Sequence, residues 1–209
     1  MPLAPPAPSA IRAVIFDFGQ VVCTFDNRRM YRALSALCGL SEEDLGRRVA
    51  RSDLPRAYET GEISSPAFLE GLSALCGFAF PEATFIRAFT DIFTPIPSTF
   101  DLIRRLKPRY RLGLLSNTSP WHAEHGIRTT KVFPLFDAAT FSYEVGAMKP
   151  DPRIYRDLLV KLRLPPEACV FIDDLPENVE GARAIGMHGI TYPGPTALLA
   201  ALQALGVEP

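Results

Sequence analysis

The sequence has almost no net charge, because its 22 Lys and Arg residues are balanced by 23 Asp and Glu residues for a formal charge of −1. Its isoelectric point is about 6.3. Proteins that bind nucleic acid or an anionic membrane surface electrostatically carry an excess of Lys and Arg, which this chain lacks. We therefore expect neither nucleic acid nor a membrane as a partner.

Long apolar runs and paired cysteine motifs are also missing. No run approaches the roughly 20 apolar residues that a membrane-spanning helix needs, and no signal-peptide core precedes a small-residue cleavage site. The cysteines form neither a Cys-x-x-Cys pair nor a Cys/His spacing typical of metal sites. We expect buried free thiols in a protein of the reducing cytoplasm. The cysteines are Cys23, Cys38, Cys76 and Cys169.

Common nucleotide-binding and nucleophile motifs are absent as well. The stretch Phe16-Asp-Phe-Gly-Gln lacks the second and third glycines of a dinucleotide-binding loop. Neither a P-loop nor a Gly-x-Ser-x-Gly elbow occurs. The chain has instead an apolar run from Ala13 to Val22 that contains a single acid, Asp17. A continuous apolar run of this kind predicts a strand buried on both faces, as in a parallel sheet.

The spacing of apolar residues divides the chain into three kinds of segment. Residues 1–10 begin with four prolines in eight residues, which predicts an extended or disordered lead-in. Between residues 26 and 97 apolar residues recur at helical spacing, which predicts a small helical cap inserted after the first strand. Residues 11–25 and 98–209 would form an α/β core. A chain of 209 residues is long enough for one core with an appended module.

Strand-like runs alternate with helical segments in the second part of the chain. This alternation predicts a doubly wound parallel sheet, an α/β fold with right-handed crossovers. The expected strands after the first are 110–115, 138–141, 169–172 and 190–192. The expected helix starts are Ser41 with Asp44, Ser65 before Pro66, Ser119 before Pro120 for a helix to about residue 131, and Asp151 before Pro152.

Polar residues follow three of the expected strands: Asp17, then Ser116 and Asn117, then Asp173 and Asp174. Because the carboxyl ends of parallel strands meet at one edge of the sheet, these side chains should share a crevice. Up to three carboxylates would repel one another there unless a cation lay between them, and oxygen ligands suit Mg²⁺. A carboxylate at such a strand end also suits a nucleophile. Taken singly, Asp17 is also consistent with a residue that caps a turn, and Ser116 and Asn117 with a simple Asx or Ser turn that leads into the next helix.

Lys149 lies in Met-Lys-Pro-Asp-Pro, where two prolines restrict the backbone and Asp151 can cap the following helix. A long side chain held at a rigid helix entrance can reach back to neutralise a phosphate and a charged nucleophile. A solvated loop lysine is the alternative. Ser116 and Asn117 would add a hydroxyl, an amide and backbone N–H groups for an anionic oxygen.

Together these residues resemble the haloacid dehalogenase (HAD) superfamily, in its branch with a helical cap after the first motif. The resemblance runs from about Ala13 to Tyr192 and implies a Rossmann-like core. It implies a Mg²⁺-dependent phosphatase that hydrolyses a small phosphate monoester, with a sugar phosphate favoured, through an aspartyl-phosphate intermediate. The implied roles are Asp17 as nucleophile, Lys149 as catalytic and phosphate-binding lysine, Ser116 and Asn117 as phosphate-binding residues, and Asp17, Gly19, Asp173 and Asp174 as Mg²⁺ ligands.

Two stretches resemble a narrower group within the superfamily. Tyr58-Glu-Thr-Gly-Glu-Ile-Ser and Asp173-Asp-Leu-Pro-Glu-Asn-Val-Glu-Gly-Ala look like bacterial phosphatases that act on glucose 1-phosphate. The narrower resemblance implies a sugar phosphate of that kind as substrate.

The sequence departs from the family pattern at Gly19, where most phosphatases of the superfamily carry a second Asp as general acid and base. The backbone carbonyl of Gly19 can still ligate Mg²⁺, but it cannot protonate a leaving group, and a positioned general acid contributes about 10² to 10⁴ in rate. The glucose 1-phosphate phosphatases that it resembles also have Gly here. We therefore expect an easier leaving group, as in an anomeric sugar phosphate or an acyl phosphate. Asp26 is a candidate substitute acid.

Two other functions stay open from the sequence. Metal-independent 2-haloacid dehalogenases of the same fold attack carbon with the equivalent Asp, but their fourth motif lacks the acidic pair that Asp173 and Asp174 retain. A non-catalytic phosphate-binding or regulatory protein is the third interpretation, with Gly19 as the trace of lost chemistry. The remaining candidates are expected to be structural: His122 and His125 on the surface, and Trp121 in packing.

Overall fold

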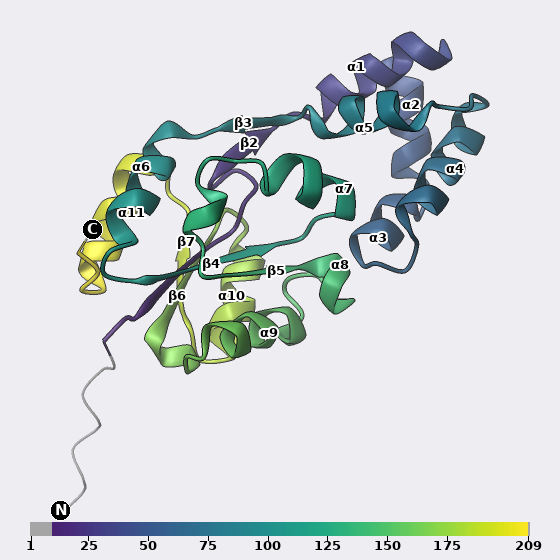
Figure 1. The fold of residues 1–209 in the computed structure, drawn as a ribbon. Helices are drawn as coiled ribbons and strands as arrows, with labels where there is room; N and C mark the ends of the chain where they lie inside the picture. Colours follow the sequence, from purple (N-terminus) through teal and green to yellow (C-terminus); the bar gives the residue numbers. More distant parts are fainter. Residues whose placement is uncertain (1–9, 209) are drawn as a thin grey trace, which may run out of the picture.

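The computed structural model describes residues 10–208, which form an α/β core with a helical cap (Figure 1). The predicted fold class, a parallel sheet covered by helices with an inserted helical region, is confirmed. The prediction of an extended lead-in at residues 1–10 falls almost wholly outside the described residues.

The central sheet is parallel throughout, in the order β5-β4-β1-β6-β7. Its middle strand β1, Ala13–Phe16, is fully buried. Successive side chains of a strand point to opposite faces, so Val14 and Phe16 pack in one core cluster and Ala13 and Ile15 in another. Because β4 and β6 flank β1, a ligand site is expected at the carboxyl ends of these three strands. The other strands are β4 (Arg111–Ser116), β5 (Ala138–Phe141), β6 (Cys169–Asp173) and β7 (His188–Thr191).

Helices cover both faces of the sheet, as a doubly wound fold requires. Helices α6 (Pro97–Leu106) and α11 (Pro195–Ala204) pack on the face of Phe16, and α9 (Pro152–Leu162) and α10 (Pro176–Ala184) pack on the other face. The Asp151 carboxylate accepts a hydrogen bond from the Arg153 N–H, which confirms the predicted start of α9. The shorter helices of the core are α7 (Pro120–His122), η1 (Ala123–Ile127), η2 (Phe133–Leu135), α8 (Ser142–Val145) and η3 (Pro166–Ala168).

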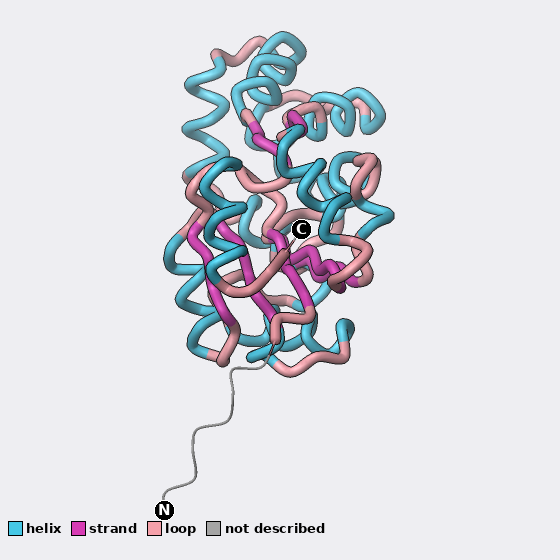
Figure 2. The backbone as a smooth tube through the Cα atoms, turned by 90° about the vertical axis from the view of Figure 1, so that its left-hand side faces the viewer, coloured by secondary structure: helices cyan, strands magenta, loops and turns pink. Residues whose placement is uncertain are grey.

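The inserted region is helical and has a hydrophobic core of its own, to which Trp121 of α7 also contributes. Two short antiparallel strands, β2 (Cys23–Phe25) and β3 (Phe93–Pro95), pair where the chain leaves and re-enters the α/β core (Figure 2). The predicted cap boundaries at residues 26 and 97 stay a prediction. The cap helices are α1 (Asn27–Cys38), α2 (Glu42–Ala50), α3 (Leu54–Glu59), α4 (Ser65–Cys76) and α5 (Glu82–Thr90).

Helix starts in the cap follow the sequence signals closely. The Ser41 hydroxyl accepts a hydrogen bond from the Asp44 N–H, as predicted for α2. In α4 the capping residue is Ser64, whose hydroxyl accepts from the Ala67 N–H, so the prediction of Ser65 was wrong by one position. The strand β3 lies in a segment for which only helices were predicted.

The segment after Ser119 does not form one helix to residue 131. Its first turn, α7, continues as the π-helix η1, which ends at Ile127. The hydroxyls of Thr129 and Thr130 donate to the carbonyl oxygens of Gly126 and Ile127, and such side-chain bonds compete with helix continuation. The helix therefore ends earlier than its apolar spacing predicts.

The four cysteines are free, and Cys38 is half-buried while the other three are buried. Among residues 10–208, no helix has both the length and the apolar character that crossing a membrane requires.

The cap touches the core closely at Gly61, in the turn after α3. Its φ is 72°, a left-handed conformation, and a Cβ there would lie against the carbonyl oxygen of Tyr143 in α8. We expect Gly61→Ala to lower the free energy of unfolding by about 2–4 kcal/mol, measured by urea denaturation. Gly39→Ala is the matched control, because Gly39 has φ 74° with nothing within 4 Å of such a Cβ. The control should lose only about 1–2 kcal/mol, and equal losses would argue against a tight cap–core contact.

Candidate active site

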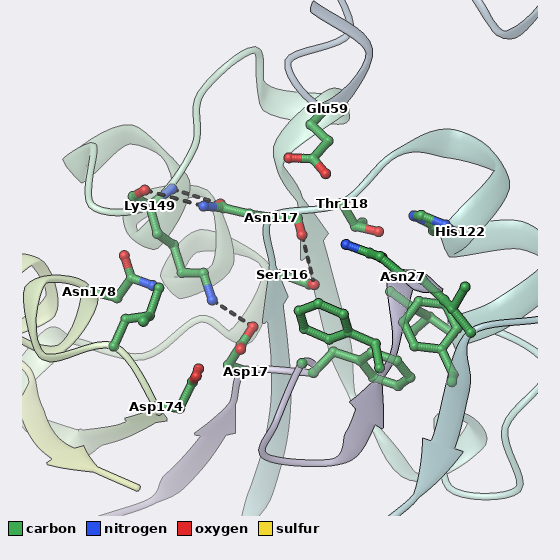
Figure 3. Close-up of a pocket in the computed structure, with 17 residues that line it drawn as sticks. Asp17, Asn27, Glu59, Ser116, Asn117, Thr118, His122, Lys149, Asp174 and Asn178 are labelled. Atoms are coloured by element: carbon green, nitrogen blue, oxygen red, sulfur yellow. Dashed lines mark hydrogen bonds and ion pairs between the residues drawn. The ribbon is translucent and has the colours of Figure 1, made fainter. Parts of the chain in front are cut away.

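A buried cluster of charged side chains lies at the carboxyl edge of the sheet (Figure 3). The Lys149 Nζ lies 2.6 Å from Asp17 Oδ1 and 2.7 Å from Asp173 Oδ2, and it donates to the carbonyl oxygen of Leu115 at 3.2 Å. The exposed side-chain fractions are 2% for Lys149, 10% for Asp17 and 0% for Asp173. The structure thus brings Lys149, from a distant loop, onto the carboxylates that follow β1 and end β6.

Backbone contacts hold the two strand-end acids in place. The N–H of Asp17 donates to the carbonyl oxygen of Ile172 in β6 at 2.8 Å. The Asp173 Oδ1 accepts from the Leu175 N–H at 2.9 Å and from the Asn178 Nδ2 at 3.0 Å. Both oxygens of Asp173 therefore have partners, whereas the neighbouring Asp174 carboxylate accepts no side-chain hydrogen bond from the described part of the chain.

Negative charge exceeds positive charge in this cluster. Burial raises the pKa of Asp17 to about 7, and the charge of Asp173 adds to the shift while Lys149 opposes it. Burial alone would lower the pKa of Lys149, but Asp17 and Asp173 outweigh that effect and raise it, so the ammonium stays charged. Burial and Asp173 together raise the pKa of Asp174. A further cation would relieve the repulsion among these carboxylates.

The carboxylates fit a divalent cation. One ligand oxygen from each of Asp17, Asp173 and Asp174 lies within 4.8 Å of the others. Hard oxygen ligands of this kind suit Mg²⁺, which keeps part of its water shell and binds phosphate oxygens. The donor set and the charge imbalance therefore both match a Mg²⁺ site.

Asn117, which follows β4, has a structural role: its side-chain amide binds the backbone of Lys149. Its Oδ1 accepts from the Lys149 N–H at 2.7 Å, and its Nδ2 donates to the Lys149 carbonyl oxygen at 3.2 Å. These two bonds hold the backbone of Lys149, so the Asn117 amide is already occupied. The hydroxyl of Ser116 is freer, since its one bond, to the Asn117 carbonyl oxygen, is 3.4 Å long.

Gly19 lies beside the Asp17 carboxylate. A Cβ at this position would be 3.8 Å from Asp17 Oδ2 and 3.0 Å from the Phe25 ring. A side chain at position 19 would thus enter space beside Asp17 that the Phe25 ring borders. Asp26 does not replace the missing acid: its carboxylate caps α1 by accepting from the Arg28 N–H at 3.0 Å, and it is absent from the cavity wall. The candidacy of Asp26 is therefore wrong.

A cavity of about 350 Å³ opens over Asp17, between the core and the cap. The polar side chains that line it and were not predicted as site residues include Asn27 from α1, Glu59 from α3 and His122 from α7 (Figure 3). The signal for Glu59 was its place in the stretch that resembles sugar-phosphate phosphatases. No local signal marked Asn27 or His122 as cavity residues.

His122 was predicted on the surface, and the structure places it in the cavity wall instead. Its ring stacks on Phe89 with centroids 4.0 Å apart, and its Nε2 donates to the Phe89 carbonyl oxygen at 2.9 Å. Burial lowers the pKa of His122 to about 4, so the ring is neutral near pH 7 and its Nδ1 is an acceptor. The predictions that Trp121 is packed and that His125 lies on the surface are confirmed. Trp121 is 6% exposed, and the side chain of His125 is 41% exposed.

Comparison with known proteins agrees with this geometry. The sequence model of haloacid dehalogenase-like hydrolases matches residues 11–186. The chain belongs to this family. It is a HAD-like hydrolase, and its motif residues are those that meet beneath the cavity.

Some relatives of this HAD-like hydrolase match it over most of their length. It is 26% identical over 186 residues to D-ribitol-5-phosphate phosphatase of Bacteroides thetaiotaomicron, and the aligned region covers 85% of this chain and 90% of that protein. The structure of a predicted HAD-like family hydrolase from Porphyromonas gingivalis superposes with a TM-score of 0.80 at 26% identity, covering 96% of this chain and 100% of the other.

A second structure shows the same fold at lower identity. It is a HAD-family enzyme of Bacteroides thetaiotaomicron in complex with magnesium and inorganic phosphate, with a TM-score of 0.78 at 22% identity over 87% of this chain and 94% of the other.

Proposed function

We propose that this HAD-like hydrolase is a Mg²⁺-dependent phosphatase of small phosphate monoesters that works through an aspartyl-phosphate intermediate. The observation that carries the proposal is the contact of Lys149 with both Asp17 and Asp173 beneath the cavity. The acidic pair Asp173 and Asp174 completes a cation site there, as phosphoryl transfer requires. The similarity to D-ribitol-5-phosphate phosphatase of Bacteroides thetaiotaomicron supports the same reaction class.

Asp17 is the proposed nucleophile. Lys149 binds its Oδ1, which leaves Oδ2 to attack phosphorus. A bond forms between Oδ2 and phosphorus while the bond from phosphorus to the leaving oxygen breaks. The leaving oxygen takes its proton from water, because Gly19 offers none. Water then attacks the phosphorus of the aspartyl phosphate, which releases inorganic phosphate and restores the carboxylate.

The remaining motif residues bind the phosphoryl group. Lys149, the Ser116 hydroxyl and the backbone of Asn117 would hold its oxygens, and Asn117 keeps Lys149 in place through its amide. Asp17, the Gly19 carbonyl, Asp173 and Asp174 would hold the metal. When bound there, Mg²⁺ supplies charge neutralisation at the phosphate oxygens.

Because Gly19 has no acidic side chain, it also limits which leaving groups can depart quickly. Since a general acid contributes about 10² to 10⁴ in rate, esters that need little protonation should react fastest. We therefore propose an acyl phosphate or an anomeric sugar phosphate such as glucose 1-phosphate as a better substrate than a primary alkyl phosphate. The stretch around Glu59, which resembles glucose 1-phosphate phosphatases, supports the sugar phosphate.

Release of inorganic phosphate from a substrate panel tests the proposal. The panel holds acetyl phosphate, p-nitrophenyl phosphate, glucose 1-phosphate and glucose 6-phosphate, each with Mg²⁺ and with excess EDTA. We expect turnover only with Mg²⁺, and kcat/KM at least about 10-fold higher for the first three, because a general acid matters most for the poorest leaving group. Equal rates for glucose 6-phosphate would contradict the leaving-group argument. Metal-independent release of chloride from 2-chloropropionate would identify a dehalogenase instead, and phosphate binding without any turnover would identify a binding protein.

A further inference from the structure

The ring of Phe25 fills the space beside Asp17 that a side chain at position 19 would enter. A Cβ at Gly19 would lie 3.0 Å from Phe25 Cε1 and 3.8 Å from Asp17 Oδ2, the proposed attacking oxygen. The edge of the ring and the nucleophile therefore border the same small volume. An acid at position 19 serves the leaving group in most phosphatases of the superfamily, so the leaving group meets the Phe25 ring there instead.

The Phe25 ring is exposed and has no aromatic partner. Phe25 is 41% exposed and lines the cavity over Asp17, and its ring makes no contact with another aromatic ring of residues 10–208. The neighbouring Phe93 ring, by contrast, is in edge contact with Phe18 and His122, with centroids 5.2 and 5.4 Å apart. An exposed ring with free faces gains burial and ring contacts when a ligand packs against it.

Backbone contacts hold Phe25 at this place. It ends β2, which pairs with β3 so that Phe25 lies opposite Phe93. The next residue, Asp26, donates its N–H to the Ile92 carbonyl oxygen at 3.0 Å, and its carboxylate caps α1. The ring is therefore carried by a paired strand between the α/β core and the cap, and it loses little conformational freedom when a ligand binds.

Leu175 is a second exposed apolar residue of the same cavity. It is 46% exposed, and its N–H donates to Asp173 Oδ1 at 2.9 Å, which fixes its backbone beside the acidic pair. Of the four large hydrophobic residues that are exposed among residues 10–208, Phe25 and Leu175 are the two that line this cavity. Exposed apolar side chains that gather at a concave site indicate a ligand surface, whereas single scattered ones do not.

The missing acid and the apolar side chains select the same kind of leaving group. Without an acid at position 19 the leaving oxygen departs as an anion, and a phenol, with a pKa of about 10 as in tyrosine, forms that anion far more readily than an alkyl alcohol does. An aromatic ring also buries apolar surface against Phe25 and Leu175. Hydroxyl groups placed against these two side chains would lose hydrogen bonds to water without replacement.

We propose that Phe25 is a specificity residue that packs against the leaving group, and that the preferred substrates are phosphate esters of small phenols. This inference rests on the proposed phosphatase function, because the phosphate must bind over Asp17. In the first step the bond between Asp17 Oδ2 and phosphorus forms and the bond from phosphorus to the phenolic oxygen breaks. The electron pair of the broken bond leaves on that oxygen as a phenolate, which then takes a proton from water. Leu175 provides a further apolar contact.

Four phosphates separate the effect of the ring from leaving-group ability. Phenyl phosphate and benzyl phosphate carry a ring, whereas acetyl phosphate and n-propyl phosphate do not, and the first of each pair has the easier leaving group. Phe25→Ala should lower the ratio of kcat/KM for phenyl phosphate to that for acetyl phosphate by about 10-fold, because a ring contact and its buried apolar area are lost. The ratio of benzyl to propyl phosphate should fall by a similar factor.

Two further variants separate recognition from structure. Leu175→Ala should lower the ratio of phenyl to acetyl phosphate by about 3- to 5-fold, since a smaller apolar contact is lost. Leu37→Ala is the matched control, because Leu37 is 37% exposed on α1 but is absent from the cavity wall, so both ratios should stay at the wild-type value. Urea denaturation of each variant shows whether its fold is retained.

A binding measurement decides the inference without turnover. Phenylphosphonate and methylphosphonate have a carbon–phosphorus bond that replaces the ester bond, so neither releases phosphate by this reaction. With Mg²⁺, calorimetric titration should show that the wild type binds phenylphosphonate at least about 10-fold more tightly and that Phe25→Ala loses most of this preference. Equal affinities in the wild type, a preference retained in Phe25→Ala, or a higher kcat/KM for glucose 1-phosphate than for phenyl phosphate would overturn the inference even if phosphatase activity is present. Failure to release phosphate from any ester would overturn the proposed function, while the titration would still decide the role of Phe25.

Discussion

Asp17→Asn should lose at least about a thousand-fold in kcat for acetyl phosphate, because an amide cannot form the aspartyl-phosphate intermediate. The fold should be retained. Asn keeps the shape of Asp and an oxygen that can accept from Lys149, and it removes one of the charges that repel Asp173. The free energy of unfolding should therefore fall by less than about 1 kcal/mol. Steady-state phosphate release and urea denaturation measure the two quantities.

Asp26→Asn is the control for this substitution. Asp26 is nine residues from Asp17 in the sequence, but it caps α1 and does not line the cavity. Asn is as good an N-cap as Asp, so both activity and stability should stay close to those of the wild type. An Asp17→Asn enzyme with more than a tenth of wild-type turnover, or an equal loss in Asp26→Asn, would refute the assignment of the nucleophile.

Lys149→Met should be the most destabilising change in the active site. The substitution leaves Asp17 and Asp173 buried without their cation, and removing one partner from a buried ion pair costs about 3–5 kcal/mol. We expect that loss in urea denaturation with EDTA. Mg²⁺ should restore part of it, because the metal neutralises the same carboxylates. The rise in Tm on adding Mg²⁺ should therefore be larger in Lys149→Met than in the wild type. Turnover should fall at least about 100-fold, because the phosphate and the nucleophile both lose the positive charge of Lys149.

Lys161→Met provides the surface comparison. Lys161 pairs with Asp157 at 2.7 Å, but its side chain is 37% exposed, and ion pairs of this kind contribute about 1 kcal/mol or less. Mg²⁺ should shift the Tm of this variant as it shifts that of the wild type. Similar stability losses in the two variants, or a smaller Mg²⁺ effect in Lys149→Met, would contradict both the buried pairing and the cation site.

Several parts of the fold were predictable because their signals are local. The apolar run of β1 needs packing on both faces, which places it in the middle of a parallel sheet. Ser41 and Asp151 cap helices by bonding to residues two or three positions away, so their roles depend only on nearby sequence. The meeting of Asp17 and Asp173 follows from strand direction, since parallel strands end at the same edge.

The task of Asn117 could not be predicted in this way. An amide at a strand end resembles a ligand-binding group or a turn residue, and the choice depends on what lies opposite. The loop that brings Lys149 to the sheet also places its backbone N–H and carbonyl against the Asn117 amide. The pairing is long-range, so it leaves no pattern in either segment.

The sequence by itself determined the alternation of strands and helices, the inserted helical cap, and the acids and lysine that gather at the carboxyl edge of the sheet. Only the tertiary structure decided which cap residues face them. Helical spacing shows which side of each cap helix is apolar, but the position of the cap over the core comes from contacts such as the Tyr58 hydroxyl with the Trp121 N–H at 3.2 Å. In the sequence, Glu59 and His122 look like ordinary helix residues. Both line the cavity only because the cap core and the α/β core pack against each other in this orientation.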